Sequence, residues 1–155
     1  MTELTIIGDD QNFTRNLRRR VESRDIKVKC VPDATLAHAT DIAVVPPGCK
    51  AVHYDGGARL RCKTLLLPGG LQADFADAGC VVTYGMSAKD TITLSSIGED
   101  SCVLALQREL VTAPGGVLDR QEIKVQGAGA TGADELLAAS GAILLLGLDP
   151  GGVGS

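Results

Sequence analysis

The chain has 155 residues, a net charge of −4, and only two tyrosines, two phenylalanines and no tryptophan. This length predicts a single domain that buries its own core. The acidic balance provides no general attraction to phosphate backbones, and the scarcity of aromatic rings removes the stacking surfaces that bind single-stranded nucleic acids. The composition therefore argues against a nucleic-acid partner.

The sequence predicts a cytoplasmic protein that does not enter a membrane. The first residues lack the basic and apolar regions of a secretory signal. The apolar runs are much shorter than the ~20 residues that span a bilayer. The five cysteines stand singly, at positions 30, 49, 62, 80 and 102. Their spacing matches neither a disulfide framework nor a standard zinc site, so we expect a reducing compartment and no metal centre.

The N-terminal part begins with a predicted strand at 4–10 and a predicted helix at 11–23. The first segment, LTIIGDD, is an apolar run closed by a turn and two acidic residues. In the second segment, apolar residues recur at Phe13, Leu17 and Val21, which is the spacing of one helix face. This helix should therefore turn a narrow apolar stripe toward the sheet.

Strand-like runs continue to alternate with other elements as far as residue 85. We expect strands at 26–31, 41–46, 63–70 and 80–85, short helices at 33–39 and 71–79, and a hairpin at 51–62. Alternation of strands and helices is typical of α/β folds with a parallel sheet. The sequence therefore predicts a Rossmann-like, mainly parallel sheet flanked by helices.

The pattern changes after Gly85, where three strand-like runs follow one another through short turns. These runs cover 90–97, 101–110 and 121–126. Such short connections predict antiparallel neighbours, because a parallel crossover needs a dozen or more residues. The Ala- and Leu-rich segment at 131–147 then predicts a closing helix, or a helix followed by a strand.

We therefore expect one α/β domain over residues 1–147 and a flexible, Gly-rich tail at 148–155. Within the domain, the parallel part covers 1–85, the antiparallel extension 86–127, and the closing segment 128–147. The junction between the first two parts is interpreted as a hinge that leads from the sheet into a hairpin.

The candidate ligand-binding residues lie where predicted strands end, because ligands of doubly wound folds bind beyond the carboxyl ends of their strands. They are Gly8, Asp9, Asp10, Asn12, Gly69, Gly70, Tyr84 and Ser87. Asp9 and Asp10 carry oxygen ligands that can hold a divalent cation. The alternative, which we favour, is that Asp10 caps the following helix while Asp9 is solvated. The chain contains neither GxGxxG nor GxxxxGK[ST], the two glycine-rich phosphate loops.

A second group of polar residues lies between Cys49 and Cys62. This segment also contains His53 and Asp55, so its side chains can in principle bind a metal or form a nucleophilic Cys–His pair. No standard ligand spacing relates the four residues. We therefore favour a surface hairpin that carries incidental polar residues.

A third group follows the strand that ends near Tyr84. A lysine such as Lys89 can lower the pKa of a tyrosine for acid–base chemistry. The alternative is a polar strand end in which Ser87 and Asp90 form a turn. The chain also lacks GxSxG, the signature of a hydrolase serine. The sequence thus identifies no catalytic residue, no metal ligand and no cofactor.

The stretch CVVTYGMSAKDTITLSSIGEDSCVLALQRELV resembles the end of the central domain of Mur-type peptide ligases. There, a parallel sheet ends in a strand of the form vxTYG and the chain enters a small antiparallel unit. VQGAGATGADELLAASGAILLLG is similar to the Gly- and Ala-rich helix that follows, so the resemblance covers 80–147. It implies a shared architecture. It does not imply ligase activity, because the phosphate loop, the magnesium ligands and the His-Asn pair are absent.

Three functions fit these observations. The first, which we favour, is a non-catalytic cytoplasmic module that binds a small molecule or a protein partner and acts in regulation. The second is a homo-oligomeric structural protein, which an apolar and unpaired strand edge after Gly85 would favour. The third is an enzyme that acts on a nucleotide or another anionic substrate at the strand ends around Asp9, Asp10, Gly69 and Gly70.

Overall fold

The computed structural model describes residues 1–34, 39–49, 52, 56–126 and 132–151. These residues form two helices, α1 (Gln11–Val21) and α2 (Ala133–Leu145). The strands are β1 (Thr2–Ile7), β2 (Ile26–Val31), β3 (Ala39–Val44), β4 (Leu60–Pro68), β5 (Ala76–Tyr84), β6 (Ile92–Ile97), β7 (Ser101–Leu106), β8 (Leu110–Val111), β9 (Val117–Leu118) and β10 (Gln121–Gln126).

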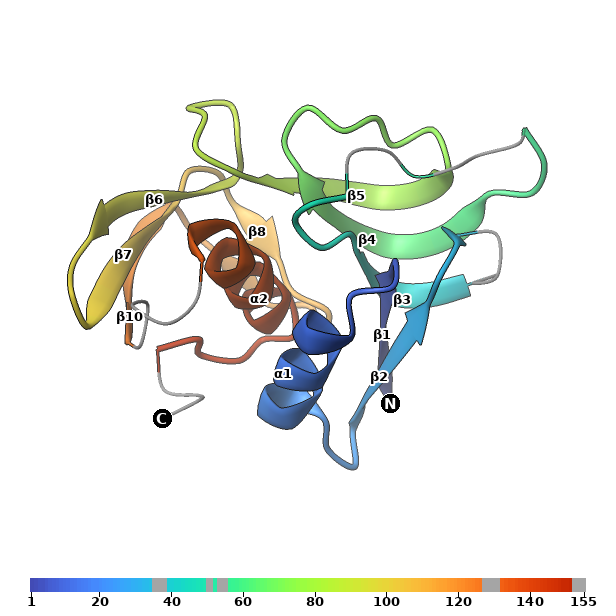
Figure 1. The fold of residues 1–155 in the computed structure, drawn as a ribbon, viewed down its shortest axis with the longest axis horizontal. Coiled ribbons are helices and arrows are strands. Elements are labelled where there is room, and N and C mark those ends of the chain that lie inside the picture. Colours follow the sequence, from blue (N-terminus) through green and yellow to red (C-terminus); the bar gives the residue numbers. More distant parts are fainter. Residues whose placement is uncertain (35–38, 50–51, 53–55, 127–131, 152–155) are drawn as a thin grey trace.

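Eight strands form one sheet in the order β10-β7-β6-β5-β4-β3-β1-β2. The strands from β5 to β2 are parallel, whereas β6, β7 and β10 are antiparallel neighbours. A single residue pair, Tyr84 with Ile92, joins β5 to β6. Figure 1 shows the antiparallel strands on one side of this junction and the parallel strands on the other. The predicted α/β fold, with an antiparallel extension after Gly85, is confirmed.

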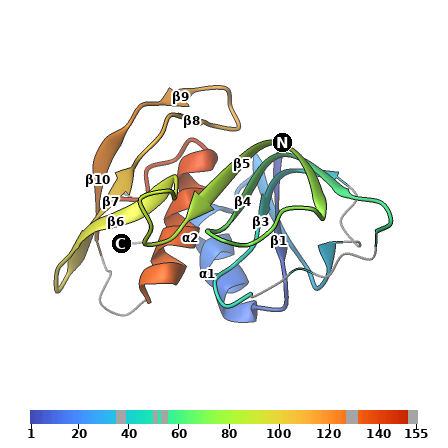
Figure 2. The same cartoon turned by 90° about the horizontal axis from the view of Figure 1, so that it is seen from above.

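Both helices lie side by side on one face of the sheet (Figures 1 and 2). Helix α1 buries the predicted stripe of Phe13, Leu17 and Val21. Helix α2 buries nine of its thirteen residues, as expected for a helix that is apolar around its whole circumference. It contacts β3, β4, β5 and β6. Helix α2 therefore bridges the parallel part and the antiparallel extension.

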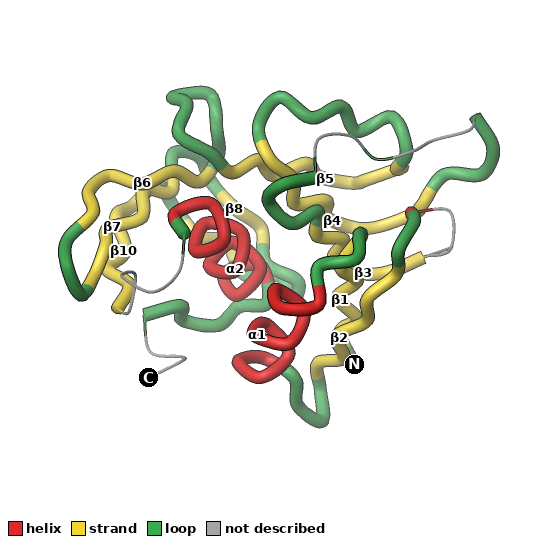
Figure 3. Tube along the Cα trace, viewed as in Figure 1, coloured by secondary structure: helices red, strands yellow, loops and turns green. Residues whose placement is uncertain are grey.

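The opposite face of the sheet covers a second, smaller core. Ile7, Leu65 and Leu67 point to this face, because successive side chains of a strand alternate. They pack with Phe75 from the loop 69–75, one of the loops drawn green in Figure 3. Burial on both faces explains why these strands read as continuous apolar runs in the sequence.

The predicted short helix at 71–79 is wrong. Residues 69–75 form a loop, and Ala76 already belongs to β5, where it pairs with Leu60 of β4. Phe75 is buried in the second core. The helical preference of an Ala-containing segment is weak, and strand pairing together with burial overrides it here.

The predicted hairpin at 51–62 is wrong in its described half. Residues 60–62 open β4, which pairs in parallel with β3 on one side and with β5 on the other. Both sides are occupied, so no antiparallel arm can pair there. Residues 51 and 53–55 of this hairpin lie outside the described residues, as do 35–38 of the predicted helix at 33–39.

The strand predicted at 101–110 is divided in two. Strand β7 ends at Leu106, and Leu110 instead opens the small β8–β9 hairpin. The main-chain N–H of Ala113 in this hairpin donates to the Leu145 carbonyl at 2.7 Å. This bond holds the hairpin at the carboxyl end of α2, apart from the main sheet (Figure 2).

The first residues of the predicted flexible tail are held in place. The N–H of Leu148 donates to the Ile143 carbonyl at 3.0 Å, and Pro150 is buried. The Pro150 carbonyl also accepts a bond from Nη2 of Arg20 in α1, at 3.4 Å. Residues 148–151 of the predicted flexible tail are thus hydrogen-bonded and packed against the domain, whereas 152–155 lie outside the described residues.

Candidate functional site

Four neighbouring parallel strands, β1, β3, β4 and β5, end at the same edge of the sheet, and a glycine-containing turn follows each of them. Gly8, Gly48 and Gly70 have φ values of 121°, 89° and 88°. Residues with a Cβ rarely adopt such angles, which is why these turns require glycine. The chain leaves the sheet sharply at each turn, and two hollows lie between the turns.

The first hollow lies between the turns after β1 and β3 and has a volume of about 580 Å³. Its lining includes the predicted residues Gly8, Asp9, Asp10 and Asn12, which face the segment 46–49. The chain proceeds from β1 to β2 on one side and to β3 on the other, so the strand order reverses here. Doubly wound sheets with the order 2-1-3-4-5 bind ligands at this switch point.

The second hollow, of about 650 Å³, lies beyond the ends of β4 and β5. Its lining includes the other four predicted residues, Gly69, Gly70, Tyr84 and Ser87. Both hollows are lined by residues 47–49, so they adjoin each other. We call the two hollows together the strand-end groove.

Asp90 lines the second hollow and holds its surrounding turns together through hydrogen bonds. Its side chain is 4% exposed, and its Oδ2 accepts a bond from the Ser87 N–H at 3.0 Å. The main-chain carbonyl of Asp90 accepts a further bond from Nε2 of Gln107 at 2.7 Å. The carboxylate lies so close to Gly69 and Gly85 that neither position has room for a Cβ. The turn predicted from Ser87 and Asp90 is therefore confirmed. The absence of a side chain at Gly69 and Gly85 leaves the space that the Asp90 carboxylate occupies.

Tyr84 is a structural residue of the groove, and its surroundings do not suit the acid–base pair with Lys89 that was considered as one alternative. Its hydroxyl donates to the Val45 carbonyl at 2.7 Å, and the side chain is 2% exposed. Burial, reinforced by the charges of Asp134 and Cys49, raises the pKa of this phenol far above its usual range. Lys89 is exposed. Tyr84 therefore stays protonated and ties the end of β5 to the segment after β3.

The groove carries mainly negative charge. Asp9 and Asp10 line the first hollow, and Asp90 and Asp134 line the second, where Lys89 is the one cation among the lining residues described. Asp10 and Asp134 also lie at the N-termini of α1 and α2. A helix N-terminus attracts anions, but these two are already balanced by their own carboxylates. The groove is therefore unfavourable for a phosphate group.

Asp10 is the N-cap of α1, as predicted, since its Oδ1 accepts the Phe13 N–H at 3.0 Å. We expect Asp10→Ala to lower the free energy of unfolding by about 1 kcal/mol, because this N–H loses its partner. Asp10→Asn keeps an acceptor oxygen and should retain most of the stability. Urea unfolding of the three proteins measures both effects. Equal losses in the two variants would show that the charge matters and the hydrogen bond does not.

The cysteines differ sharply in their surroundings. Cys62 is buried in the second core, and burial raises the pKa of its thiol to about 11. Burial also raises the pKa of Cys102. Cys80, in contrast, is exposed on β5. Cys49, which lines the groove, packs against the same second core that buries Cys62, while His53 and Asp55 lie outside the described residues. No cluster of three metal-binding side chains is found in the part of the chain that is described.

This difference predicts the order of thiol labelling in the folded protein. At pH 8 we expect a maleimide to modify Cys80 within minutes and to leave Cys62 and Cys102 unmodified until the protein is unfolded. At this pH only about one Cys62 thiol in a thousand is ionised, and the thiolate is the reacting form. Peptide mass spectrometry after timed labelling measures the order. Early labelling of Cys62 would contradict the burial described above.

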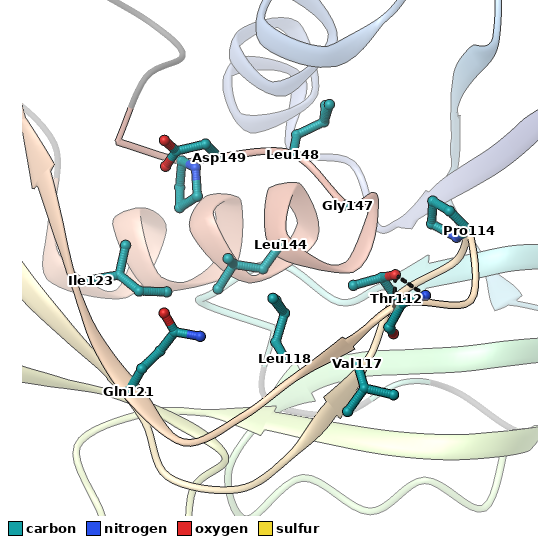
Figure 4. Close-up of a pocket in the computed structure, with 12 residues that line it drawn as sticks. Thr112, Pro114, Val117, Leu118, Gln121, Ile123, Leu144, Gly147, Leu148 and Asp149 are labelled. Atoms are coloured by element: carbon teal, nitrogen blue, oxygen red, sulfur yellow. Dashed lines mark hydrogen bonds between the residues drawn. The ribbon is translucent and has the colours of Figure 1, made fainter.

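A third hollow, of about 590 Å³, lies away from the strand ends and was not predicted from the sequence. Figure 4 shows Leu118 and Ile123 from the β8–β10 region and Leu144 from α2 around it. Thr112 also lines it, but its hydroxyl already accepts the Gly116 N–H at 2.9 Å. The lining is thus mainly apolar.

The structure brings all eight predicted residues to the strand-end groove, although their role in binding a ligand remains a prediction. Asp134 was not predicted from the sequence, and Asp90 was predicted only as part of a turn. An acidic residue in the first turn of a predicted helix is a signal that could have drawn attention to Asp134.

The site belongs to a Rossmann-like α/β domain. Comparison with protein-family models, with curated protein sequences and with solved structures finds no match for this chain. Among the described residues, no helix is long and apolar enough to cross a membrane.

Proposed function

We propose that this chain is a non-catalytic module that binds a small polar molecule in the strand-end groove. The observation that carries the proposal is the position of the first hollow at the switch point between β1 and β3. Hollows of about 600 Å³ are within the range that binds small molecules in proteins, roughly 300–1,000 Å³. A change in this groove would reach α1 and α2 directly, which suits a regulatory role.

The charge of the groove indicates the ligand's chemical class. Four carboxylates face one ammonium group among the lining residues described, so a phosphate or carboxylate ligand would be repelled. An amine, or a neutral molecule rich in hydroxyl groups, would find acceptor oxygens instead. This argument supports a binding module for a cationic or neutral ligand over an enzyme acting on a nucleotide.

A thermal-shift screen tests the proposal. Polyamines, amino acids and sugar alcohols form one arm, and nucleotides with and without Mg²⁺ form the other. A ligand at about 100 times its dissociation constant adds ~2.7 kcal/mol of stability, which gives a clear rise in Tm. We expect rises in the first arm only.

Matched variants locate the binding site. Asp9 is exposed on the rim of the first hollow, and Asp119 is an exposed aspartate outside both hollows. Asp9→Asn should weaken binding of the hit, whereas Asp119→Asn should leave it unchanged. A nucleotide that raises Tm and loses this effect in Asp9→Asn would overturn the proposal in favour of the enzyme.

A further inference from the structure

The eight-stranded sheet has four open strand edges, and three of them are protected. An unprotected edge pairs readily with another strand, so natural sheets carry charges, bulges or covering segments at such edges. The fourth edge, that of β5, has much less of this protection.

The two outer strands are protected in different ways. Strand β2 carries Lys27 and Lys29, which are both exposed, so pairing with a second copy would bring lysines together. Strand β10 carries Glu122 and Lys124. The tail also passes directly against this edge, since a Cβ on Gly151 would lie only 2.6 Å from the Lys124 carbonyl oxygen.

The other two open edges arise inside the sheet, where β5 and β6 share only the pair Tyr84–Ile92. Beyond that pair, each strand leaves one edge free. The edge of β6, which follows Gly85, is interrupted by a bulge between Leu94 and Ser96. Its outer residues are two exposed serines and the exposed Ile97, so this edge is mixed in character and is not the apolar edge after Gly85 that would favour an oligomer.

Among the described residues, the open edge of β5 has the least protection of the four, since no bulge interrupts it. Its sequence, ADAGCVVTY, contains no proline, no lysine and a single charge at Asp77. Four of its nine residues are exposed, namely Asp77, Gly79, Cys80 and Val81. Of these, Val81 is 49% exposed. The strand is nine residues long and regular in its pairing with β4.

We propose that β5 pairs antiparallel with β5 of a second copy of this chain, forming a dimer with two-fold symmetry. A strand edge is self-complementary in an antiparallel pair, and two-fold dimers are the commonest homo-oligomers. Two-fold pairs centred on Gly79, Cys80 or Val81 place Asp77 opposite Val81, Thr83 or Gly85 of the partner. None of these is charged, so the single acidic residue of β5 never faces its own copy.

Light scattering after size exclusion tests the dimer, with a chain mass of 16.0 kDa as the reference. The wild type should have twice this mass. The double variant Cys80→Asp/Val81→Asp places aspartates opposite each other in all three registers, so it should run as a monomer with an unchanged circular dichroism spectrum. A wild type that stays monomeric at its solubility limit would overturn the proposal.

The control variant Ile97→Asp/Val111→Asp adds the same charge at two exposed apolar positions outside β5, which are 64% and 51% exposed. It should remain a dimer. A bismaleimide should also join two wild-type chains through Cys80 and fail to join them in Cys80→Ser. Dissociation of the control, or cross-linking that survives in Cys80→Ser, would place the interface elsewhere and overturn the proposal.

Discussion

Replacing Gly69 by alanine is expected to lower the free energy of unfolding by about 2–3 kcal/mol. The backbone of Gly69 accepts an L residue, so the cost comes from the new methyl group, which would collide with the Asp90 carboxylate. The carboxylate is buried and bonded to the Ser87 N–H, so it cannot move aside without losing that bond. Urea unfolding of the variant and the wild type measures the loss.

A double-mutant cycle separates this collision from other effects. In an Asp90→Ala background the obstacle is gone, so adding Gly69→Ala should cost little more. Gly70→Ala is the matched control, because a Cβ at Gly70 meets nothing within 4 Å and is opposed only by its φ of +88°. Its cost, about 1–2 kcal/mol, should add independently to that of Asp90→Ala. If the losses of stability in Gly69→Ala and Asp90→Ala were additive, the Asp90 carboxylate could not be packed against Gly69 as the structure shows.

Gly141→Leu in α2 is expected to be at least as damaging, with a loss of about 3 kcal/mol. Gly141 is buried where the helix crosses the sheet, and even a Cβ would lie 3.0 Å from Ile92 Cδ1 and 3.1 Å from Leu66 Cδ2. The helix would have to lift from β4 and β6 at the point where it bridges them. Thermal and urea unfolding measure the effect.

Smaller changes in the same helix serve as controls. Gly141→Ala should change stability by less than about 1 kcal/mol, because its higher helix propensity offsets a close contact with flexible side-chain ends. Ala139→Leu adds the same side chain at a partly exposed position and should be tolerated. If Gly141→Leu were tolerated equally, the helix could not be packed as closely as the structure shows.

Local patterns predicted the elements whose formation depends on neighbours in the sequence. The stripe at Phe13, Leu17 and Val21 and the cap at Asp10 determine α1 within one segment, and both predictions are confirmed. The strands of the parallel part read as apolar runs because both of their faces are buried. The position of the groove could be predicted from the same strands, because ligands of such folds bind beyond the carboxyl ends of the strands.

The errors arose where distant partners decide the conformation. Residues 76–79 extend β5 because β4 provides a neighbour, and no local signal identifies that neighbour. The buried position of the Asp90 carboxylate depends on Gly69, which belongs to a different turn. The open edge of β5 depends on how few residues it shares with β6. Strand pairing of this kind is a property of the whole chain and has no short-range signature.

The central position of α2 also has a consequence for the order of synthesis. This helix lies near the end of the chain, yet its residues fill the main core between strands that are made much earlier. While the ribosome is still producing the antiparallel extension, the part of this apolar face that α1 does not cover stays open. At about 5–20 residues per second, this interval lasts several seconds. The nascent chain is therefore a natural client for chaperones until its last helix emerges.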